Sequence, residues 1–343
     1  MLKELCEKYP HASDFVIRRG EVYVISSKMV VGREVINEEV YKELVVRLVR
    51  NGELDVDTSY EEGGYRFRVN VSTYDGGKEK EITLRWLKDV SISLPDRFIQ
   101  VGLVSVVDRI RKKKGGIMLV IGPTGSGKST FMAGVLNALL ESEPIRVITL
   151  EDPVEYYLKA GRGIVLQREV GVDVESFARG LKSALRQNPN VIFVGEVRDE
   201  ETVELLLQAG DTGHVVFATL HTDKAGDTLE RLLGLLPVAK HEIALKQLAK
   251  NLIGIVGVRL FDIDGRKVSI YEYLNISNDP AVQSVIARRD FANIGVYTSN
   301  VEKGHIPFEL SVADLVKSGV ISREHIGLLP VKQELVLRHV NAR

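Results

Sequence analysis

Cysteine is nearly absent from this chain, because Cys6 is the single cysteine among 343 residues. One thiol can form neither an intramolecular disulfide nor a four-thiolate zinc site, and it fits a reducing compartment. A chain of this length predicts two domains, at roughly 100–200 residues per domain. Domains of that size bury a hydrophobic core without help from disulfides or metals.

Long apolar runs are absent as well. No stretch approaches the roughly 18 apolar residues of a membrane span. Residues 1–14 contain no basic segment followed by an apolar one. We therefore expect neither a membrane-spanning helix nor a secretion signal.

Neither sign of charge is in excess, because 46 Lys and Arg against 47 Asp and Glu leave a net charge of −1. The molecule therefore gains little from long-range attraction to nucleic acid or anionic lipid, and any such contact needs a local patch. The hydrophobic share of 44% and the charged share of 27% are those of an ordinary folded protein. They exclude collagen-like, disulfide-rich and disordered classes.

The first hundred residues predict a small α+β domain. Apolar residues recur at helical spacing from Val40 to Leu48, and Asn37 is placed to cap that helix. Two predicted hairpins flank it, formed by strands over 15–17 and 22–25 and by strands over 64–71 and 81–86.

The second hairpin separates apolar from basic side chains. Its period of two places Tyr65, Phe67 and Val69 on one face and Arg66 and Arg68 on the other. In the partner strand, Arg85 likewise lies opposite the apolar residues. These arginines are therefore expected to leave the core and to be free to reach another molecule.

From residue 117 onward, short and nearly continuous apolar runs alternate with helical patterns, which is typical of a parallel sheet covered on both faces. The predicted strands are 117–121, 147–150, 164–166, 191–194 and 215–220. An antiparallel pair around 262–265 and a helix over 311–317 follow. We therefore predict an N-terminal domain over 1–95, a linker over 96–103 and an α/β domain with a helical tail over 104–343.

Residues 122–130 match the phosphate-loop pattern G-x-x-x-x-G-K-[ST] between a predicted strand and a predicted helix. The glycines let backbone N–H groups turn around phosphates at the N-terminus of that helix. Lys128, expected to be exposed, can reach the β and γ phosphates, and Ser129 can bind Mg²⁺. The alternative is a glycine-rich turn of no function. The expected nucleotide-binding residues are Pro123, Thr124, Gly125, Ser126, Gly127, Lys128, Ser129 and Thr130.

Acidic residues follow two other predicted strands. Glu196 comes after the strand at 191–194, where a phosphate-loop enzyme keeps the acid that holds Mg²⁺ or its water. Glu151, Asp152 and Glu155 lie beyond the strand at 147–150, at the edge where such sheets bind ligands. The alternative interpretations are a helix cap for Glu196 and a simple turn at Asp152.

Two histidines flank the strand at 215–220, His214 before it and His221 after it. Such residues are often structural hydrogen-bonding groups, and here they are also candidates for function. The single dense basic run, 109–114, could contact nucleic acid or lipid. Because it ends a predicted helix, a solvated helix terminus is the favoured interpretation.

Together these segments resemble the PilT-type secretion ATPases, the hexameric motors of type IV pili and related type IV secretion systems. The resemblance covers about residues 12–260. Beyond the phosphate loop, 148–155 is similar to the family's Asp box, 194–199 to its Walker B segment with Glu in place of Asp, and 212–222 to its His box. Residues 66–70 are similar to part of its PAS-like N-terminal domain.

This resemblance implies a RecA-like P-loop ATPase domain of α/β class, binding ATP, ADP and Mg²⁺, preceded by a small PAS-like α+β domain. It implies that Glu196 organises Mg²⁺ and the attacking water. Glu151 is a second candidate for activating water, and which of the two is the base stays open. His214 and His221 would communicate the state of the γ-phosphate. The arginines that match nucleotide-facing positions are Arg66, Arg68, Arg85 and Arg231, with Arg68 and Arg85 favoured.

The implied function is that of a cytoplasmic homohexameric motor, docked on an inner-membrane platform protein at the inner face of the cytoplasmic membrane and making no direct contact with nucleic acid. Pilus retraction in twitching motility is the leading interpretation, and a DotB-like secretion ATPase is close behind. The single cysteine excludes the four-cysteine zinc module of pilus-assembly members, and residues 307–319 do not contain the retraction-associated sequence AIRNLIRE. A nucleic-acid translocase and a scaffold that binds ATP without turnover are the remaining alternatives.

Overall fold

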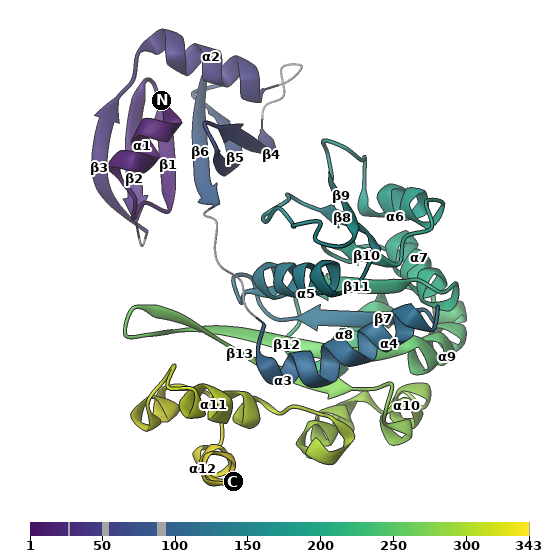
Figure 1. Ribbon diagram of the computed structural model, residues 1–343. Coiled ribbons are helices and arrows are strands. Elements are labelled where there is room, and N and C mark those ends of the chain that lie inside the picture. Colours follow the sequence, from purple (N-terminus) through teal and green to yellow (C-terminus); the bar gives the residue numbers. More distant parts are fainter. Residues whose placement is uncertain (27, 50–54, 88–93, 343) are drawn as a thin grey trace. The chain divides into compact units, whose positions relative to one another are not determined.

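The structure is a computed structural model that describes residues 1–26, 28–49, 55–87 and 94–342. The chain divides into two compact units (Figure 1). The first comprises Met1–Ser91 and Pro153–Tyr157, and the second comprises Ile92–Asp152 and Leu158–Arg343.

The first unit contains a six-stranded antiparallel sheet in the order β3-β2-β1-β6-β5-β4. Its strands are β1 (Asp14–Arg18), β2 (Glu21–Ser26), β3 (Met29–Val35), β4 (Val56–Glu62), β5 (Tyr65–Tyr74) and β6 (Glu79–Leu87). Its helices are α1 (Leu2–Lys8) and α2 (Glu38–Leu48). Both predicted hairpins and the helix are confirmed, whereas α1, β3 and β4 were not predicted.

Alternation along β5 and β6 gives the first sheet one buried and one open face. Phe67 and Leu84 are fully buried in a core that includes residues of α1 and α2. Arg68 and Arg85 lie directly opposite each other in the β5–β6 register, on the other face. The Asn37 side chain accepts a hydrogen bond from the Glu39 N–H and caps α2 as predicted.

The second unit contains a seven-stranded sheet in the order β13-β12-β7-β11-β10-β8-β9. Its strands are β7 (Gly116–Ile121), β8 (Arg146–Glu151), β9 (Ile164–Glu169), β10 (Val191–Val194), β11 (Val215–Leu220), β12 (Leu252–Ile263) and β13 (Arg266–Asn275). All neighbouring pairs are parallel except β12 with β13. The five predicted strands and the antiparallel pair are confirmed.

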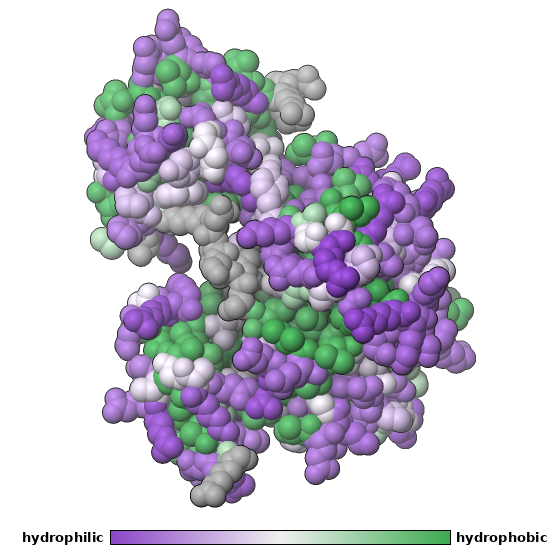
Figure 2. Space-filling model, in the orientation of Figure 1, coloured by the Kyte–Doolittle hydropathy of each residue, from purple (hydrophilic) through white to green (hydrophobic). Residues whose placement is uncertain are grey.

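Helices cover both faces of this sheet (Figure 1). One core lies under α4 and α5, and the other lies under α6, α7, α8, α9 and α10. The helices are α3 (Asp96–Phe98), α4 (Val104–Arg111), α5 (Lys128–Ser142), α6 (Phe177–Leu185), α7 (Glu200–Asp211), α8 (Ala225–Gly234), α9 (His241–Asn251), α10 (Pro280–Ala287), α11 (Phe308–Lys317) and α12 (Gln333–Asn341). On the face in view in Figure 2, hydrophobic residues of this unit gather around α4 and α5 among largely hydrophilic ones.

Residues 96–103, which the sequence predicted as a linker, are helical. They form α3 and a π-helical segment, Ile99–Leu103, that runs into α4. Phe98 is buried in the core under α5, so this segment belongs to the second unit. Arg97 makes two hydrogen bonds, of 2.6 and 2.7 Å, with the carboxylate of Asp314 on α11. No helix in the described ranges is long and apolar enough to cross a membrane.

Leu206→Ala should destabilise the second unit, because Leu206 on α7 is fully buried against the sheet. A buried Leu→Ala change costs about 2–5 kcal/mol through lost burial and the cavity left behind. Urea unfolding would measure this loss beside Gln208→Ala, which changes an exposed residue of the same helix. Equal stabilities of the two variants would contradict the packing described.

Candidate active site

The phosphate loop connects the buried strand β7 to α5, as its pattern predicts. Gly122, Gly125 and Gly127 have positive φ angles of 148°, 76° and 93°. Residues that carry a Cβ atom rarely adopt such backbone conformations. The loop can therefore direct its backbone N–H groups inward at the N-terminus of α5, whose dipole favours negative charge. Ser126 is 4% exposed, and its hydroxyl has no hydrogen-bond partner among the described residues.

Lys128 is buried rather than exposed, with only 7% of its surface accessible, so that prediction is wrong. Its ammonium group donates hydrogen bonds of 2.8 and 2.9 Å to the carbonyls of Gly122 and Pro123. Carbonyl oxygens at the base of the loop thus hold the cation inside it. The Nδ1 atom of His221 lies 3.3 Å from the same ammonium nitrogen and 3.4 Å from the hydroxyl of Thr124.

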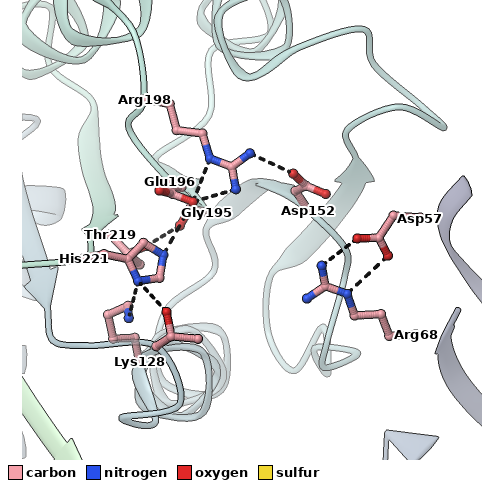
Figure 3. A network of polar contacts seen from close by, with 10 residues as sticks. Asp57, Arg68, Lys128, Asp152, Gly195, Glu196, Arg198, Thr219 and His221 are labelled. Atoms are coloured by element: carbon pink, nitrogen blue, oxygen red, sulfur yellow. Dashed lines mark hydrogen bonds and ion pairs between the residues drawn. The ribbon is translucent and has the colours of Figure 1, made fainter. Parts of the chain in front are cut away.

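Glu196 follows β10 and lies at the centre of a polar network (Figure 3). Its carboxylate accepts hydrogen bonds of 2.8 and 2.7 Å from Arg198, and it lies 3.5 Å from Nε2 of His221. Arg198 also reaches Asp152 at 3.3 Å. Its hydrogen bonding to Glu196 raises the pKa of Arg198. His221 therefore bridges the phosphate loop and the acid after β10.

Glu151 ends β8, on the far side of β10 from the phosphate loop. Its carboxylate accepts hydrogen bonds from the Thr149 hydroxyl at 2.6 Å and from the Gln167 amide at 3.1 Å. These partners fix its orientation at the same sheet edge as Glu196. The backbone N–H of Gly195, donating to the Leu150 carbonyl at 2.7 Å, holds the two strand ends together.

His214 lies at the opposite edge of the sheet from the phosphate loop. It precedes β11, and its carbonyl accepts from the N–H of Gly116 at the start of β7. Six residues of strand, about 20 Å at 3.3 Å each, separate it from the loop. His214 therefore lies far from the phosphate loop of its own chain, and its role in nucleotide binding stays a prediction. Burial lowers the pKa of His214. Its Nδ1 lies 3.1 Å from the Thr212 hydroxyl, and its buried Nε2 has no hydrogen-bond partner among the described residues.

The four arginines predicted to face nucleotide lie in different environments and contact different residues. Arg68 makes an ion pair of 2.7 Å with Asp57 (Figure 3), and Arg85 makes one of 2.9 Å with Asp14. Arg66 donates to the Val154 carbonyl at 2.9 Å, within the first unit. Arg231 is exposed on α8.

The loop residues fit the phosphates of a nucleotide. Three features support this: an enclosed cation, a buried hydroxyl without a partner, and open space around the Gly125 Cα, where an added Cβ would meet no atom within 4 Å. Among the described residues no three acidic, His or Cys side chains gather as a metal group. Mg²⁺ in such enzymes needs fewer protein ligands, because substrate phosphates and waters supply most of them.

Sequence reasoning missed the bridging role of Arg198. The sequence offered one signal, because Glu196 and Arg198 are opposite charges only two residues apart. Its contact with Asp152 depends on β10 pairing with β8, which the local sequence does not contain.

A parallel sheet with a phosphate loop after β7 and an acid after β10 defines a P-loop nucleotide hydrolase. The sequence profile of the family described as "Type II/IV secretion system protein" matches residues 42–288. The chain belongs to this family, and it is an ATPase that binds nucleotide.

Relatives along most of the chain support this assignment. The twitching motility protein of Neisseria gonorrhoeae is 35% identical over 283 residues, which are 81% of this chain and 73% of the relative. The crystal structure of the pilus retraction motor PilT with bound ADP has a TM-score of 0.78 and 33% identity, covering 97% of this chain and 98% of that one. The ATPase DotB of Legionella pneumophila has a TM-score of 0.75 and 26% identity, covering 95% and 93%.

Lys128→Ala should abolish hydrolysis and weaken nucleotide binding, because a charge-assisted hydrogen bond is worth about 1.5–3 kcal/mol, or roughly 10–150-fold in Kd. Phosphate release and titration with a fluorescent ADP analogue would measure both effects, with a melting curve to establish folding. Lys182→Ala, on the exposed face of α6, is the matched control. Normal phosphate release from folded Lys128→Ala protein would exclude this loop as the hydrolytic site.

Proposed function

We propose that this protein is a hexameric motor of a type IV pilus, driving retraction and twitching motility. The observation that carries the proposal is the continuous polar connection from Lys128 through His221 to Glu196. Such a connection can link the state of the phosphates to the acid that acts on water. The similarity to the twitching motility protein and to the retraction motor favours pilus retraction over pilus assembly.

The proposed architecture is a RecA-like ATPase domain preceded by a PAS-like domain. In the cell, the motor is proposed to be cytoplasmic and to dock on an inner-membrane platform protein. The antiparallel sheet of the first unit and the parallel sheet of the second agree with this architecture. ATP hydrolysis would then be coupled to relative motion of the two domains.

In this site Lys128 and the N-terminus of α5 would hold the phosphates. Ser129 and Glu196 would hold Mg²⁺, in part through water. The metal, when bound, neutralises charge that develops on the phosphate oxygens. Glu196 would orient the attacking water, and His221 would report the presence of the γ-phosphate to it.

We favour Glu196 over Glu151 as the acid that acts on water. β10 is two strands from β7, about 10 Å at 4.8 Å per strand, whereas β8 is three strands away. Glu196 also reaches the phosphate loop through His221, while the hydrogen bonds described for Glu151 go to Thr149 and Gln167. Glu151 would then position the segment after β8.

A DotB-like secretion ATPase is the second candidate, and the structural match to DotB favours it almost equally. A nucleic-acid translocase is less favoured, because three of the basic residues in the run have local partners. Arg109 donates to the Gly115 carbonyl, Arg111 pairs with Glu143, and Lys112 pairs with Asp108. A phosphate-release assay separates both motors from a scaffold without turnover.

Glu196→Gln should lower kcat about 100-fold or more and change nucleotide Kd by less than about threefold, because the acid acts mainly in the transition state. Glu151→Gln should have the smaller effect on kcat. Steady-state phosphate release beside nucleotide titration would measure both parameters, with Glu201→Gln, an exposed acid on α7, as control. A larger kcat loss in Glu151→Gln would reverse the assignment.

Arginines of the first unit are proposed to act on nucleotide held by a neighbouring subunit. Arg68 and Arg85 lie on the open face of their sheet, with side chains 38% and 65% exposed. Exposed ion pairs such as theirs with Asp57 and Asp14 are worth about 0–1 kcal/mol, so they exchange readily for a phosphate. An arginine acting in trans contributes about 10³–10⁵ in rate in related chemistry.

Arg68→Ala or Arg85→Ala should therefore lower kcat without preventing ATP binding. The specific activity of the unmodified protein should rise with concentration as hexamers form.

Mixing either variant with Lys128→Ala protein should restore activity, because mixed interfaces pair an intact loop with an intact arginine. Arg19→Ala, which removes an exposed arginine paired with Asp75, is the control. Concentration-independent activity with normal turnover in both arginine variants would leave them as surface ion pairs only.

A further inference from the structure

A cavity of about 580 Å³ lies within the second unit, away from the phosphate loop. Its apolar lining residues Ile255 and Leu274 come from β12 and β13 and belong to the core on the face opposite α5. The first turn of α8 and the 3-10 segment Phe291–Ser299 complete the wall. None of its described lining residues is a member of the phosphate loop or the Glu196 network.

Glu272 places a carboxyl group in this cavity. It pairs with Gly257 in the β12–β13 register, and a Cβ added to Gly257 would come within 2.9 Å of its Oε1 atom. The glycine thus provides the space for the Glu272 side chain to lie over β12. Burial raises the pKa of Glu272 to about 7, and within the described chain no hydrogen bond to its carboxyl contributes to that value. Glu272 is partly buried, and a carboxyl with a raised pKa that lines a cavity is a candidate for ligand binding.

The charged neighbours leave Glu272 without a direct partner. Arg259 on β12 favours its ionised form but lies over the ring of Phe308, 4.6 Å from the centroid, and Glu309 on α11 opposes ionisation. Arg289 is already paired with Glu230 at 2.8 Å. Arg259 and Arg289 are therefore engaged elsewhere, and Lys224 at the start of α8 is the remaining cation of the lining.

The remaining charged residues of the lining are mostly acidic. Asp223 and Asp227 flank Lys224 where the chain enters α8, and Asp290 accepts a hydrogen bond from Asn293. Apart from the Glu230–Arg289 ion pair, the lining has more acidic than basic residues, and part of its surface is apolar. Such a cavity favours a ligand that carries positive charge on an apolar stem.

We propose that this cavity binds an alkyl cation, an amine or guanidinium group on an aliphatic stem, with Glu272 as its anionic anchor. The cation donates hydrogen bonds to the carboxylate, and the stem packs against Ile255 and Leu274. A free polyamine-like molecule and a lysine or arginine side chain of a protein share this chemistry. Asp223 and Lys224, which line the same cavity, follow His221 within three residues of the chain.

Cation binding can be measured by isothermal titration calorimetry of the full chain with agmatine and, separately, with N-acetyl-arginine amide. With a pKa of about 7, the ionised fraction of Glu272 rises from roughly a tenth at about pH 6 to nine tenths at about pH 8. The cation requires the ionised form, so binding should be about tenfold tighter at the higher pH. Glu272→Gln should weaken binding at least tenfold and remove this pH dependence.

Two controls keep the result specific. Glu302→Gln makes the same charge change at an exposed site and should bind normally. Glu272→Gln keeps the shape of the side chain and removes a charge that partial burial disfavours, so above pH 7 the variant should melt no lower than the unmodified protein. Lys128→Ala should bind the cation normally, which separates this site from the ATPase site.

Binding of agmatine alone would identify a free small molecule as the occupant, and binding of the capped arginine would identify a protein side chain. Three outcomes would overturn the proposal. These are no binding of either probe up to about 10 mM, equal affinity at both pH values, and unchanged affinity in Glu272→Gln.

Discussion

Parallel hydrogen bonding among β7, β11 and β10 is the constraint on which the active site depends. Ile121 pairs with Leu220, and Ala218 pairs with Val194, so the three strands end at one edge of the sheet. The phosphate loop, His221 and Glu196 then follow within two residues of those ends. Because both faces of these strands are buried, a shift in register would misplace the whole core together with the site.

The same geometry explains which parts of the site the sequence could predict. A short apolar run bounded by polar residues identifies each strand, and the loop pattern is contiguous, so β7, the loop and α5 follow from local information. The two histidines flank opposite ends of β11, as the sequence already places them, and the structure puts only His221 at the edge that carries the phosphate loop. Arg198 meets Asp152 through the pairing of β10 with β8, which is tertiary information.

The first unit was predicted less completely because its outer strands carry weak signals. β3 exposes most of its side chains, and β4 is a mixture of polar and acidic residues, so neither shows a clear buried face. The central hairpin was predicted because its alternation is strong. Its open face places Arg68 opposite Arg85, and an aspartate beside each arginine offsets the repulsion between them.

The ion pair between Arg97 and Asp314 joins the beginning and the end of the second unit, 217 residues apart in the chain. The Arg97 guanidinium donates two hydrogen bonds to the two carboxylate oxygens of Asp314, so two distant segments of the chain are held together by a bidentate ion pair. Detaching α11 would leave the Arg97 guanidinium without this partner and loosen the helix on which Phe98 enters the core. The C-terminal segment is therefore part of the ATPase unit, to which it is joined by this ion pair and by the core that α11 and α12 share with β13.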